Sequence, residues 1–196
     1  GMRHRVVKLP EEGFDAVVGN PPYTRWAEIP GAVQDNIKDR LGTVLTKYNL
    51  HADVARGKEP GVYVHFILWA KEFLNPGGRL GMIISDSWLQ TDYGMEFGRF
   101  LLENFKVRAL IDVSARVFPV PLVGACIILV EKPHEDEKLE DNQVIYMYLS
   151  IPKEESLKVD EVLRVIKDPK TATGHYIVNV VRQGDLPKNQ KWINFI

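Results

Sequence analysis

Short apolar runs alternate along the chain with segments whose apolar residues recur every three or four positions, which predicts an α/β fold. The apolar runs have the length of buried strands, and Gly, Pro or Asn follows several of them. We expect strands at residues 14–19, 79–84, 107–112, 125–130, 144–149 and 176–181. We expect helices at residues 62–74, 97–105 and 159–167, and after Pro30, where Val33, Ile37 and Leu41 are four residues apart.

Two connections lack a periodic pattern. The segment Ser114–Gly124 contains prolines and no helical pattern, so it is not the usual helical crossover between parallel strands. We therefore expect the strand after it to run antiparallel in a mixed sheet. The segment Gly42–Gly61 is long for a loop in a compact domain, and loops of that length often carry function. We expect it to be irregular and to act as a lid or face nucleic acid.

Composition limits the class of protein. The chain has 196 residues, 45% of them hydrophobic and 26% charged, which excludes a disordered or collagen-like chain. Its net charge of −1 excludes a strongly basic nucleic-acid-binding domain, so any such contact must be local. The single cysteine excludes an internal disulfide, and no Cys/His spacing suits a metal site. No apolar run is long enough to span a bilayer, so we expect a cytoplasmic protein without a membrane partner.

The tetrapeptide Asn20-Pro21-Pro22-Tyr23, directly after the first predicted strand, is the strongest chemical signal. Each proline holds the residue before it extended and brings no N–H group, so the turn is stiff and its oxygens stay available. The Asn20 side-chain oxygen and the Pro21 carbonyl can accept both hydrogens of a planar amino group. The Tyr23 ring can stack on the molecule that carries this amino group. The alternative is a proline turn with a packed tyrosine.

Four later segments extend this pattern in order along the chain. They are residues 61–66, 74–80, 84–89 and 116–119, the last of which leads into the run 125–131. Together with the tetrapeptide, this series resembles the DNA adenine-N6 methyltransferases of restriction-modification systems, particularly the type II and type IIG enzymes. The resemblance covers about Phe14 to Lys132. It implies a partial Rossmann-like methyltransferase domain that uses S-adenosylmethionine.

The resemblance assigns roles to the residues that match the family's motifs. Asn20, Pro21, Pro22 and Tyr23 would be the catalytic residues, with Asn20 also bordering the cofactor. Tyr23 and Phe118 would hold the target adenine by stacking, after the base has left the duplex. Accepting the two amino hydrogens helps the nitrogen become a nucleophile toward the sulfonium methyl. Neither a general base nor a metal is then required.

The chain departs from the family at its start. Such enzymes bind the cofactor on a glycine-rich loop before the tetrapeptide, and the nineteen residues ahead of Asn20 contain no such turn. We therefore expect residues 1–132 to be the carboxyl half of a catalytic domain, with the main cofactor-binding loop absent from this chain. Residues 133–196 would form a hinge and a small α+β extension toward a missing target-recognition domain.

This interpretation also predicts partners. Double-stranded DNA would bind through the parent enzyme, and the missing amino-terminal half of the catalytic domain would have to be supplied. The isolated chain would then be inactive. Its first strand would lack a neighbour, and either residues 2–9 or a second copy in a homodimer would cover the exposed edge.

Two other functions stay open. Asn-Pro-Pro-Tyr also occurs in methyltransferases that act on a protein glutamine amide or on an RNA guanine amino group, although residues 85–89 and 117–119 argue against both. A non-catalytic binding subunit is the other alternative, because a fold does not by itself imply an activity.

Several further residues have a functional and a structural interpretation. His65 is expected to be a hydrogen-bonded core residue, and Cys126 a buried strand residue. One strand-end turn either borders the predicted pocket or only packs its tryptophan: Ser85, Asp86 and Trp88. Three basic residues of the long irregular segment could contact phosphates, although a solvated loop is the stronger expectation: Lys47, Arg56 and Lys58.

Overall fold

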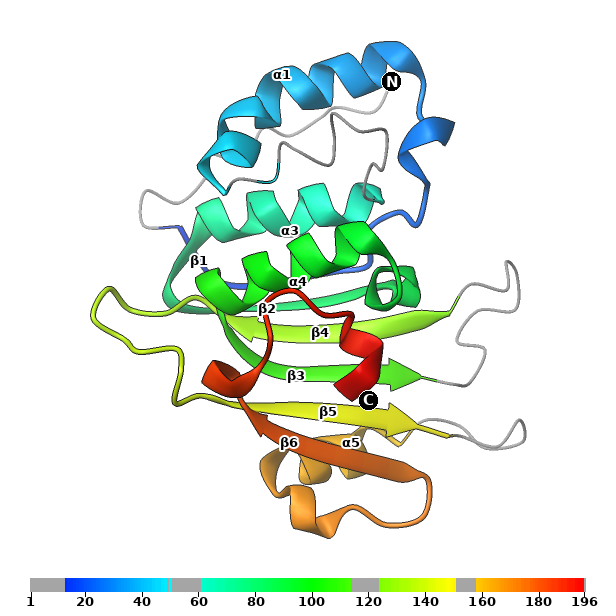
Figure 1. Ribbon diagram of the computed structural model, residues 1–196, viewed down its shortest axis with the longest axis vertical. Helices are drawn as coiled ribbons and strands as arrows, with labels where there is room; N and C mark the ends of the chain where they lie inside the picture. The colour runs from blue at the N-terminus through cyan, green and yellow to red at the C-terminus, as the bar shows by residue number, and fades with distance from the viewer. Residues whose placement is uncertain (1–12, 49, 51–60, 114–123, 151–157, 196) are drawn as a thin grey trace, which may run out of the picture.

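The computed structural model describes residues 13–48, 50, 61–113, 124–150 and 158–195, and these residues form one mixed sheet with helices on both faces (Figure 1). Six strands pair in the order β1-β2-β4-β3-β5-β6. Their bounds are β1 Phe14–Gly19, β2 Leu74–Ser85, β3 Lys106–Val113, β4 Ala125–Glu131, β5 Gln143–Leu149 and β6 Tyr176–Arg182. The predicted α/β fold is confirmed, and each predicted strand is present.

The strand directions define a common carboxyl edge. β1 runs parallel to β2, and β3 runs parallel to β5. β4 lies between β2 and β3 and is antiparallel to both, as expected from the proline-containing connection before it. β6 is antiparallel to β5. β1, β2, β3 and β5 therefore end at the same edge of the sheet, where β4 and β6 begin.

β2 begins earlier than the sequence pattern predicts. The expected strand starts at Arg79, after an expected turn, whereas β2 starts at Leu74. The register of β2 against β1 shifts in this segment, between the pairs Phe14–Leu74 and Ala16–Arg79. Gly77 has a φ of 77° there, and its N–H donates to the Lys132 carbonyl at 2.7 Å. Long-range backbone hydrogen bonds thus keep a turn-like sequence in the sheet.

Three helices lie on one face of the sheet and a fourth on the other. Their bounds are α1 Gly31–Lys47, α3 Val62–Phe73, α4 Asp92–Asn104 and α5 Val159–Lys167.

The prediction of an irregular segment from Gly42 is wrong in its first part, because α1 continues through it. Val44 and Tyr48 pack against the core, and the Tyr48 ring lies 4.8 Å from Phe100. Residues 51–60 of that segment lie outside the described residues.

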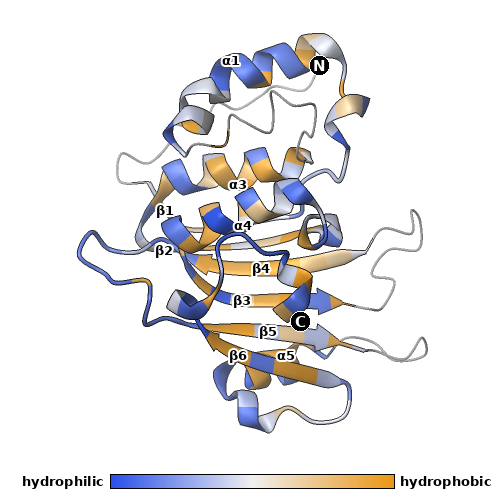
Figure 2. Ribbon diagram, in the orientation of Figure 1, coloured by the Kyte–Doolittle hydropathy of each residue, from blue (hydrophilic) through white to orange (hydrophobic). Residues whose placement is uncertain are grey.

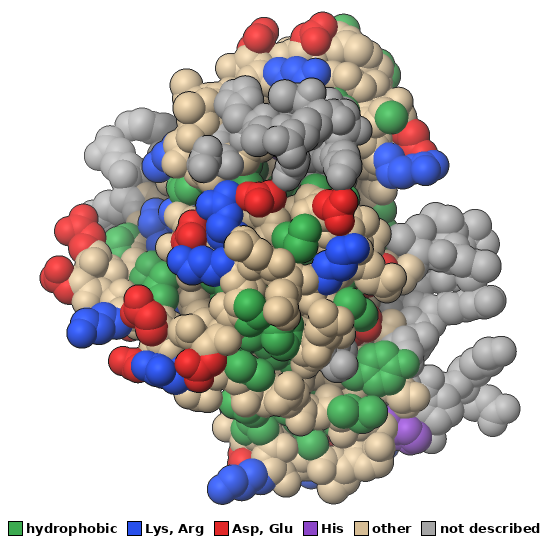
Figure 3. Space-filling model, viewed as in Figure 1, with side chains coloured by type: hydrophobic (Ala, Val, Ile, Leu, Met, Phe, Trp, Pro, Cys, Tyr) green, Lys and Arg blue, Asp and Glu red, His purple; other side chains and the backbone are tan. Residues whose placement is uncertain are grey.

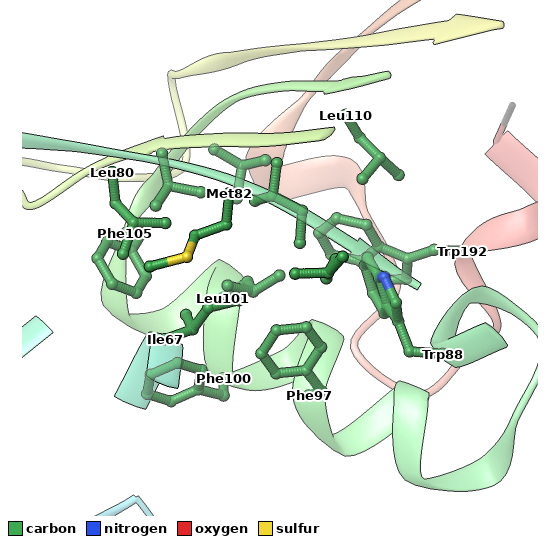
Figure 4. Close-up of a cluster of buried hydrophobic side chains, with 14 of the residues drawn as sticks. Ile67, Leu80, Met82, Trp88, Phe97, Phe100, Leu101, Phe105, Leu110 and Trp192 are labelled. Atoms are coloured by element: carbon green, nitrogen blue, oxygen red, sulfur yellow. The ribbon is translucent and has the colours of Figure 1, made fainter. Parts of the chain in front are cut away.

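The main core lies between the sheet and helices α3 and α4. Two indole rings, from Trp88 and Trp192, lie 5.2 Å apart at one end of it. Each core side chain labelled in Figure 4 is 4% exposed or less: Ile67, Leu80, Met82, Trp88, Phe97, Phe100, Leu101, Phe105, Leu110 and Trp192. Burying a large apolar side chain of this kind contributes roughly 1.5–3 kcal/mol. This core holds the strand ends in fixed positions.

A smaller core lies on the opposite face, under α5. Val162 and Val165 of α5 pack with Ile111 of β3 and Met147 of β5. Figure 2 shows that apolar residues concentrate on the central strands, while α1 is largely hydrophilic. None of the helices that the structure describes is long and apolar enough to cross a bilayer.

β1 is an edge strand among the described strands, because it pairs only with β2. Val18 is 83% exposed, and Ala16 is exposed as well. Residues 2–9, one expected cover for this edge, lie outside the described residues. The alternative cover, a second copy of the chain, stays a prediction.

A buried glutamine joins the extension after residue 132 to the rest of the sheet. Gln183 follows β6 and is 4% exposed. Its Oε1 accepts hydrogen bonds from the Val107 N–H at 3.1 Å and from Asn142 Nδ2 at 2.8 Å. Its Nε2 donates to the carbonyls of Leu102 and Phe105, each at 2.8 Å. β5 and β6 thus continue the same sheet, and a domain division at residue 132 stays a prediction.

An acidic residue, Glu131, ends β4 at the edge opposite the strand carboxyl ends and is 8% exposed. Arg108 Nη2 and Lys106 Nζ lie 3.0 and 3.3 Å from its carboxylate oxygens. Burial opposes ionisation, but the hydrogen bonds and charges of these two cations outweigh it and lower the pKa of Glu131.

Candidate functional site

One edge of the sheet brings together most of the described residues to which the sequence assigns chemistry. The tetrapeptide follows β1, the turn Ser85–Leu89 follows β2, and Asp112 lies near the end of β3. Cys126 of β4 pairs with Ile84 on one side and with Asp112 on the other, so these positions form one row across the sheet. Open α/β sheets bind ligands at the carboxyl ends of their strands. The candidate site therefore lies at this edge.

The tetrapeptide is anchored by its second residue. Pro21 is buried, while Asn20 and Pro22 are exposed and Tyr23 is partly buried. The two proline rings restrict the backbone on either side of Pro21. Because the anchor is buried and the neighbouring Asn20 is exposed, an amide oxygen is available to a ligand on a rigid turn.

Tyr23 presents a neutral phenol at this edge. Burial raises the pKa of Tyr23 to about 12, and the nearby Cys126 and Asp86 add to the rise. The ring stays uncharged at neutral pH. It can therefore act as an aromatic surface next to the Asn20 and Pro21 oxygens.

Asp86 is packed against the start of β4. Its N–H donates to the Gly124 carbonyl at 3.2 Å. A Cβ atom added to Gly124 would lie 1.8 Å from Asp86 Oδ2, so a larger residue in this position would displace the Asp86 carboxylate. Burial raises the pKa of Asp86. That Asp86 borders the site stays a prediction, and the nearby Asp86 adds to the raised pKa of Tyr23.

Asp112 is a neighbour of this site that the sequence reasoning missed. Burial and the nearby Asp86 carboxyl both raise its pKa. A signal was present in the sequence, because Asp112 directly follows the apolar residues 109–111 at the end of a predicted strand. Two acidic side chains here favour a ligand with hydrogen-bond donors or positive charge over a phosphate group.

Trp88 follows the structural interpretation of the same turn. It is 0% exposed, and its Nε1 donates to Cys126 Sγ at 3.4 Å. Cys126 is itself 0% exposed, which confirms the prediction of a buried strand residue. Ser85 is buried and bonds within the turn, because its Oγ donates to Ser87 Oγ at 3.0 Å.

His65 is buried as expected, but the expectation of a hydrogen-bonded core residue is wrong. It is 5% exposed, and within the described part of the chain its Nδ1 has no hydrogen-bond partner. Burial lowers the pKa of His65 to about 4, so the ring is neutral at neutral pH. Its neighbour is the Trp26 ring, at a centroid distance of 4.9 Å.

Of the three basic residues that could contact phosphates, the structure describes only Lys47, and it pairs with a carboxylate. Lys47 bonds the Glu72 carboxylate at 3.0 Å on the surface of α1 and α3. Arg56, Lys58 and Phe118 lie outside the described residues. On the face that Figure 3 shows, the described Lys and Arg side chains lie among Asp and Glu side chains, without a broad basic area.

The described residues suit the reactive end of S-adenosylmethionine. Asn20 and Asp86 offer oxygen atoms, and Tyr23 offers a ring, which are groups that suit an amino group and a positively charged sulfonium. Residues 13–19 are the described residues ahead of the tetrapeptide, and they contain no glycine-rich turn.

Comparisons with known proteins identify the family of the chain. The model of the Eco57I restriction-modification methylase family matches residues 5–118. The type II methyltransferase M.XhoI of Xanthomonas vasicola is 30% identical over 135 residues, which cover 68% of this chain and 22% of that protein. The type II methyltransferase M.BstVI of Geobacillus stearothermophilus is 34% identical over 100 residues, which cover 51% of this chain and 16% of that protein. The chain thus spans less than a quarter of the length of either relative.

A solved structure shows the same fold. The type IIG restriction endonuclease BpuSI superimposes with a TM-score of 0.68 at 15% identity, over 96% of this chain and 22% of that protein. The family match covers more than half of the chain and contains the tetrapeptide and the turn after β2. The chain therefore belongs to the Eco57I restriction-modification methylase family, and the relatives named above are type II methyltransferases.

Proposed function

We propose that this chain provides the target-base side of the catalytic site in a DNA methyltransferase that modifies the N6 amino group of adenine. The observation that carries the proposal is the rigid tetrapeptide at the carboxyl end of β1, with Pro21 buried and Asn20 exposed. Its two oxygen acceptors match the two hydrogens of an exocyclic amino group. The partly buried Tyr23 ring lies next in sequence and matches the flat base that carries this group.

The reaction follows from these groups. S-adenosylmethionine would supply the methyl group from its sulfonium centre. Asn20 Oδ1 and the Pro21 carbonyl would each accept one amino hydrogen, which stabilises the positive charge that develops on the nitrogen as the N–C bond forms and the S–C bond breaks. The nitrogen then releases one proton to water. Tyr23 would hold the flipped adenine by stacking, and Phe118 is proposed as the second aromatic side chain at the base.

We also propose that the rest of the cofactor site comes from polypeptide outside this chain. The relatives are more than four times as long as the regions that they share with it. Within residues 13–195, the described groups at the candidate edge suit only the reactive end of the cofactor. The 196-residue chain alone should then neither bind S-adenosylmethionine tightly nor methylate DNA. Titration calorimetry that shows micromolar binding by this chain would contradict the proposal.

The adenine assignment is tested by mutation of the full-length gene product. Its single-turnover methyl transfer to duplex DNA is measured, and the modified nucleosides are identified after digestion. Stacking of one base contributes about 1–3 kcal/mol, so Tyr23→Ala should slow transfer about five- to hundredfold. Tyr23→Phe keeps the ring and should stay within about threefold of the wild type. Equal losses in the two variants, or a methylated base other than N6-methyladenine, would overturn the proposed role.

A further inference from the structure

The residues after the tetrapeptide rest on the first turn of α3. Trp26 lies three residues beyond Tyr23 and is 3% exposed. Its ring lies 4.9 Å from the ring of His65, with 55° between the planes. A backbone hydrogen bond also joins this segment to α3, because the Val62 N–H donates to the Thr24 carbonyl at 3.4 Å. The turn Val62–His65 thus contacts the chain segment that carries the proposed catalytic residues.

The same turn of α3 also holds the turn after β2. Tyr63 is 1% exposed, and its hydroxyl lies 2.6 Å from the hydroxyl of Tyr93 and 3.5 Å from Ser87 Oγ. Ser87 is linked in turn to Ser85, whose Oγ donates to Ser87 Oγ at 3.0 Å. Four hydroxyl groups therefore connect α3, the start of α4 and the end of β2. Asp86, which is predicted to border the candidate site, lies between the two serines.

The contact between His65 and Trp26 buries polar atoms, which lowers stability in a way that is not expected of residues that only fill the core. Within the described residues, neither His65 Nδ1 nor Trp26 Nε1 has a hydrogen-bond partner, although both side chains are at least 95% buried. Buried polar atoms without partners reduce stability, and two apolar side chains would avoid that cost. Gly61, the residue before α3, is also close to Tyr63: a Cβ atom added to Gly61 would lie 2.3 Å from the Tyr63 ring. Stability alone does not account for this arrangement.

We infer that the first turn of α3 is the positioning element of the methyl-transfer site, with Tyr63 and His65 as its positioning residues. The inference rests on the proposed function. His65 holds the Tyr23–Trp26 segment through the Trp26 ring, and Tyr63 holds the Ser85–Leu89 turn through its hydroxyl. Methyl transfer requires the amino nitrogen and the methyl donor to be aligned closely, and a shift of about 1 Å in such a site can lower the rate about a hundredfold. One turn of helix that contacts both segments keeps them in a fixed relation.

The inference is tested with Tyr63→Phe and His65→Leu in the full-length gene product. Tyr63→Phe removes only the hydroxyl and keeps the buried ring, so the fold is retained. Tyr176→Phe is the matched control, because it removes a hydroxyl that bonds Glu161 at 3.1 Å, a residue of α5 on the opposite face. We expect each variant to lower the single-turnover methyl-transfer rate about tenfold: Tyr63→Phe by loss of its buried hydroxyl hydrogen bonds, and His65→Leu by loss of the ring contact with Trp26. The dissociation constant for DNA should stay within about twofold, and the control should change neither quantity.

A second measurement follows the two segments directly in the 196-residue chain. Hydrogen exchange should accelerate at residues 85–90 in Tyr63→Phe and at residues 23–29 in His65→Leu, and at neither segment in Tyr176→Phe. Unchanged exchange in the two test variants, or an equal rate loss in the control, would overturn the inference. If the wild-type protein transfers no methyl group, the proposed function fails on its own, and the exchange data still decide whether α3 holds the two segments.

Discussion

Replacing Gln183 with leucine tests whether the extension after residue 132 is part of one cooperative structure. Leucine has a similar size but removes four hydrogen bonds, to Val107, Asn142, Leu102 and Phe105. Val107 and Phe105 are 0% exposed, so the Val107 N–H and the Phe105 carbonyl would lose this partner away from water. Each buried polar group left without a partner costs about 1–3 kcal/mol.

The expected loss of stability is smaller than four such costs added together. Water can replace the bond to the Asn142 side chain, because that residue is only partly buried. We therefore expect Gln183→Leu to lower the free energy of unfolding by about 3–5 kcal/mol, out of a total of about 5–15 kcal/mol for a typical domain. With a urea dependence of about 2 kcal/mol per molar, the midpoint should fall by roughly 2 M.

Urea unfolding followed by the fluorescence of the buried Trp88 and Trp192 measures this shift. Gln143→Leu is the control, because Gln143 is exposed at the start of β5 and its loss should change stability by less than about 0.5 kcal/mol. A midpoint for Gln183→Leu equal to that of the control would refute the reasoning. Two separate transitions in the wild type would show that the extension unfolds on its own, which a buried glutamine shared by both parts does not allow.

Three further predictions concern single positions. Gly124→Ala should lower stability by about 1–3 kcal/mol through the clash with Asp86, and adding Asp86→Ala should recover most of it, whereas additive losses would show that the two residues do not touch. The pKa of Glu131 is lowered from 4.5 in the folded state, so its stabilisation is present above that value and is lost as pH falls through the lower folded-state pKa. The stability difference between wild type and Glu131→Gln should therefore be largest near pH 7 and shrink below about pH 4.5, and a pH-independent difference would contradict this. Burial raises the pKa of the Cys126 thiol, so it should react with a thiol reagent only after unfolding, and fast labelling of the native protein would disagree.

Much of this protein could be predicted from short-range patterns. The runs of apolar residues predicted all six strands, because burial on a sheet requires several consecutive residues of one kind. The prolines between residues 114 and 124 excluded a helical crossover, and β4 is antiparallel. The tetrapeptide at Asn20 was identifiable because its chemistry depends on adjacent residues, which no distant contact has to supply. Its position at a strand end followed from the valine-rich run before it.

Other features depend on residues that are distant in sequence, and only the tertiary structure shows them. A local pattern does not specify that β4 lies between β2 and β3, and this pairing is what places Asp112 beside Cys126 and near Asp86. The length of α1 depends on the packing of Tyr48 against Phe100, and the start of β2 depends on backbone bonds to Lys132. Strand order and side-chain clusters arise from contacts that form when the whole sheet assembles, so their energies have no counterpart in any single segment. Local sequence thus determines whether a segment is a helix or a strand, whereas the tertiary structure determines which residues surround the site.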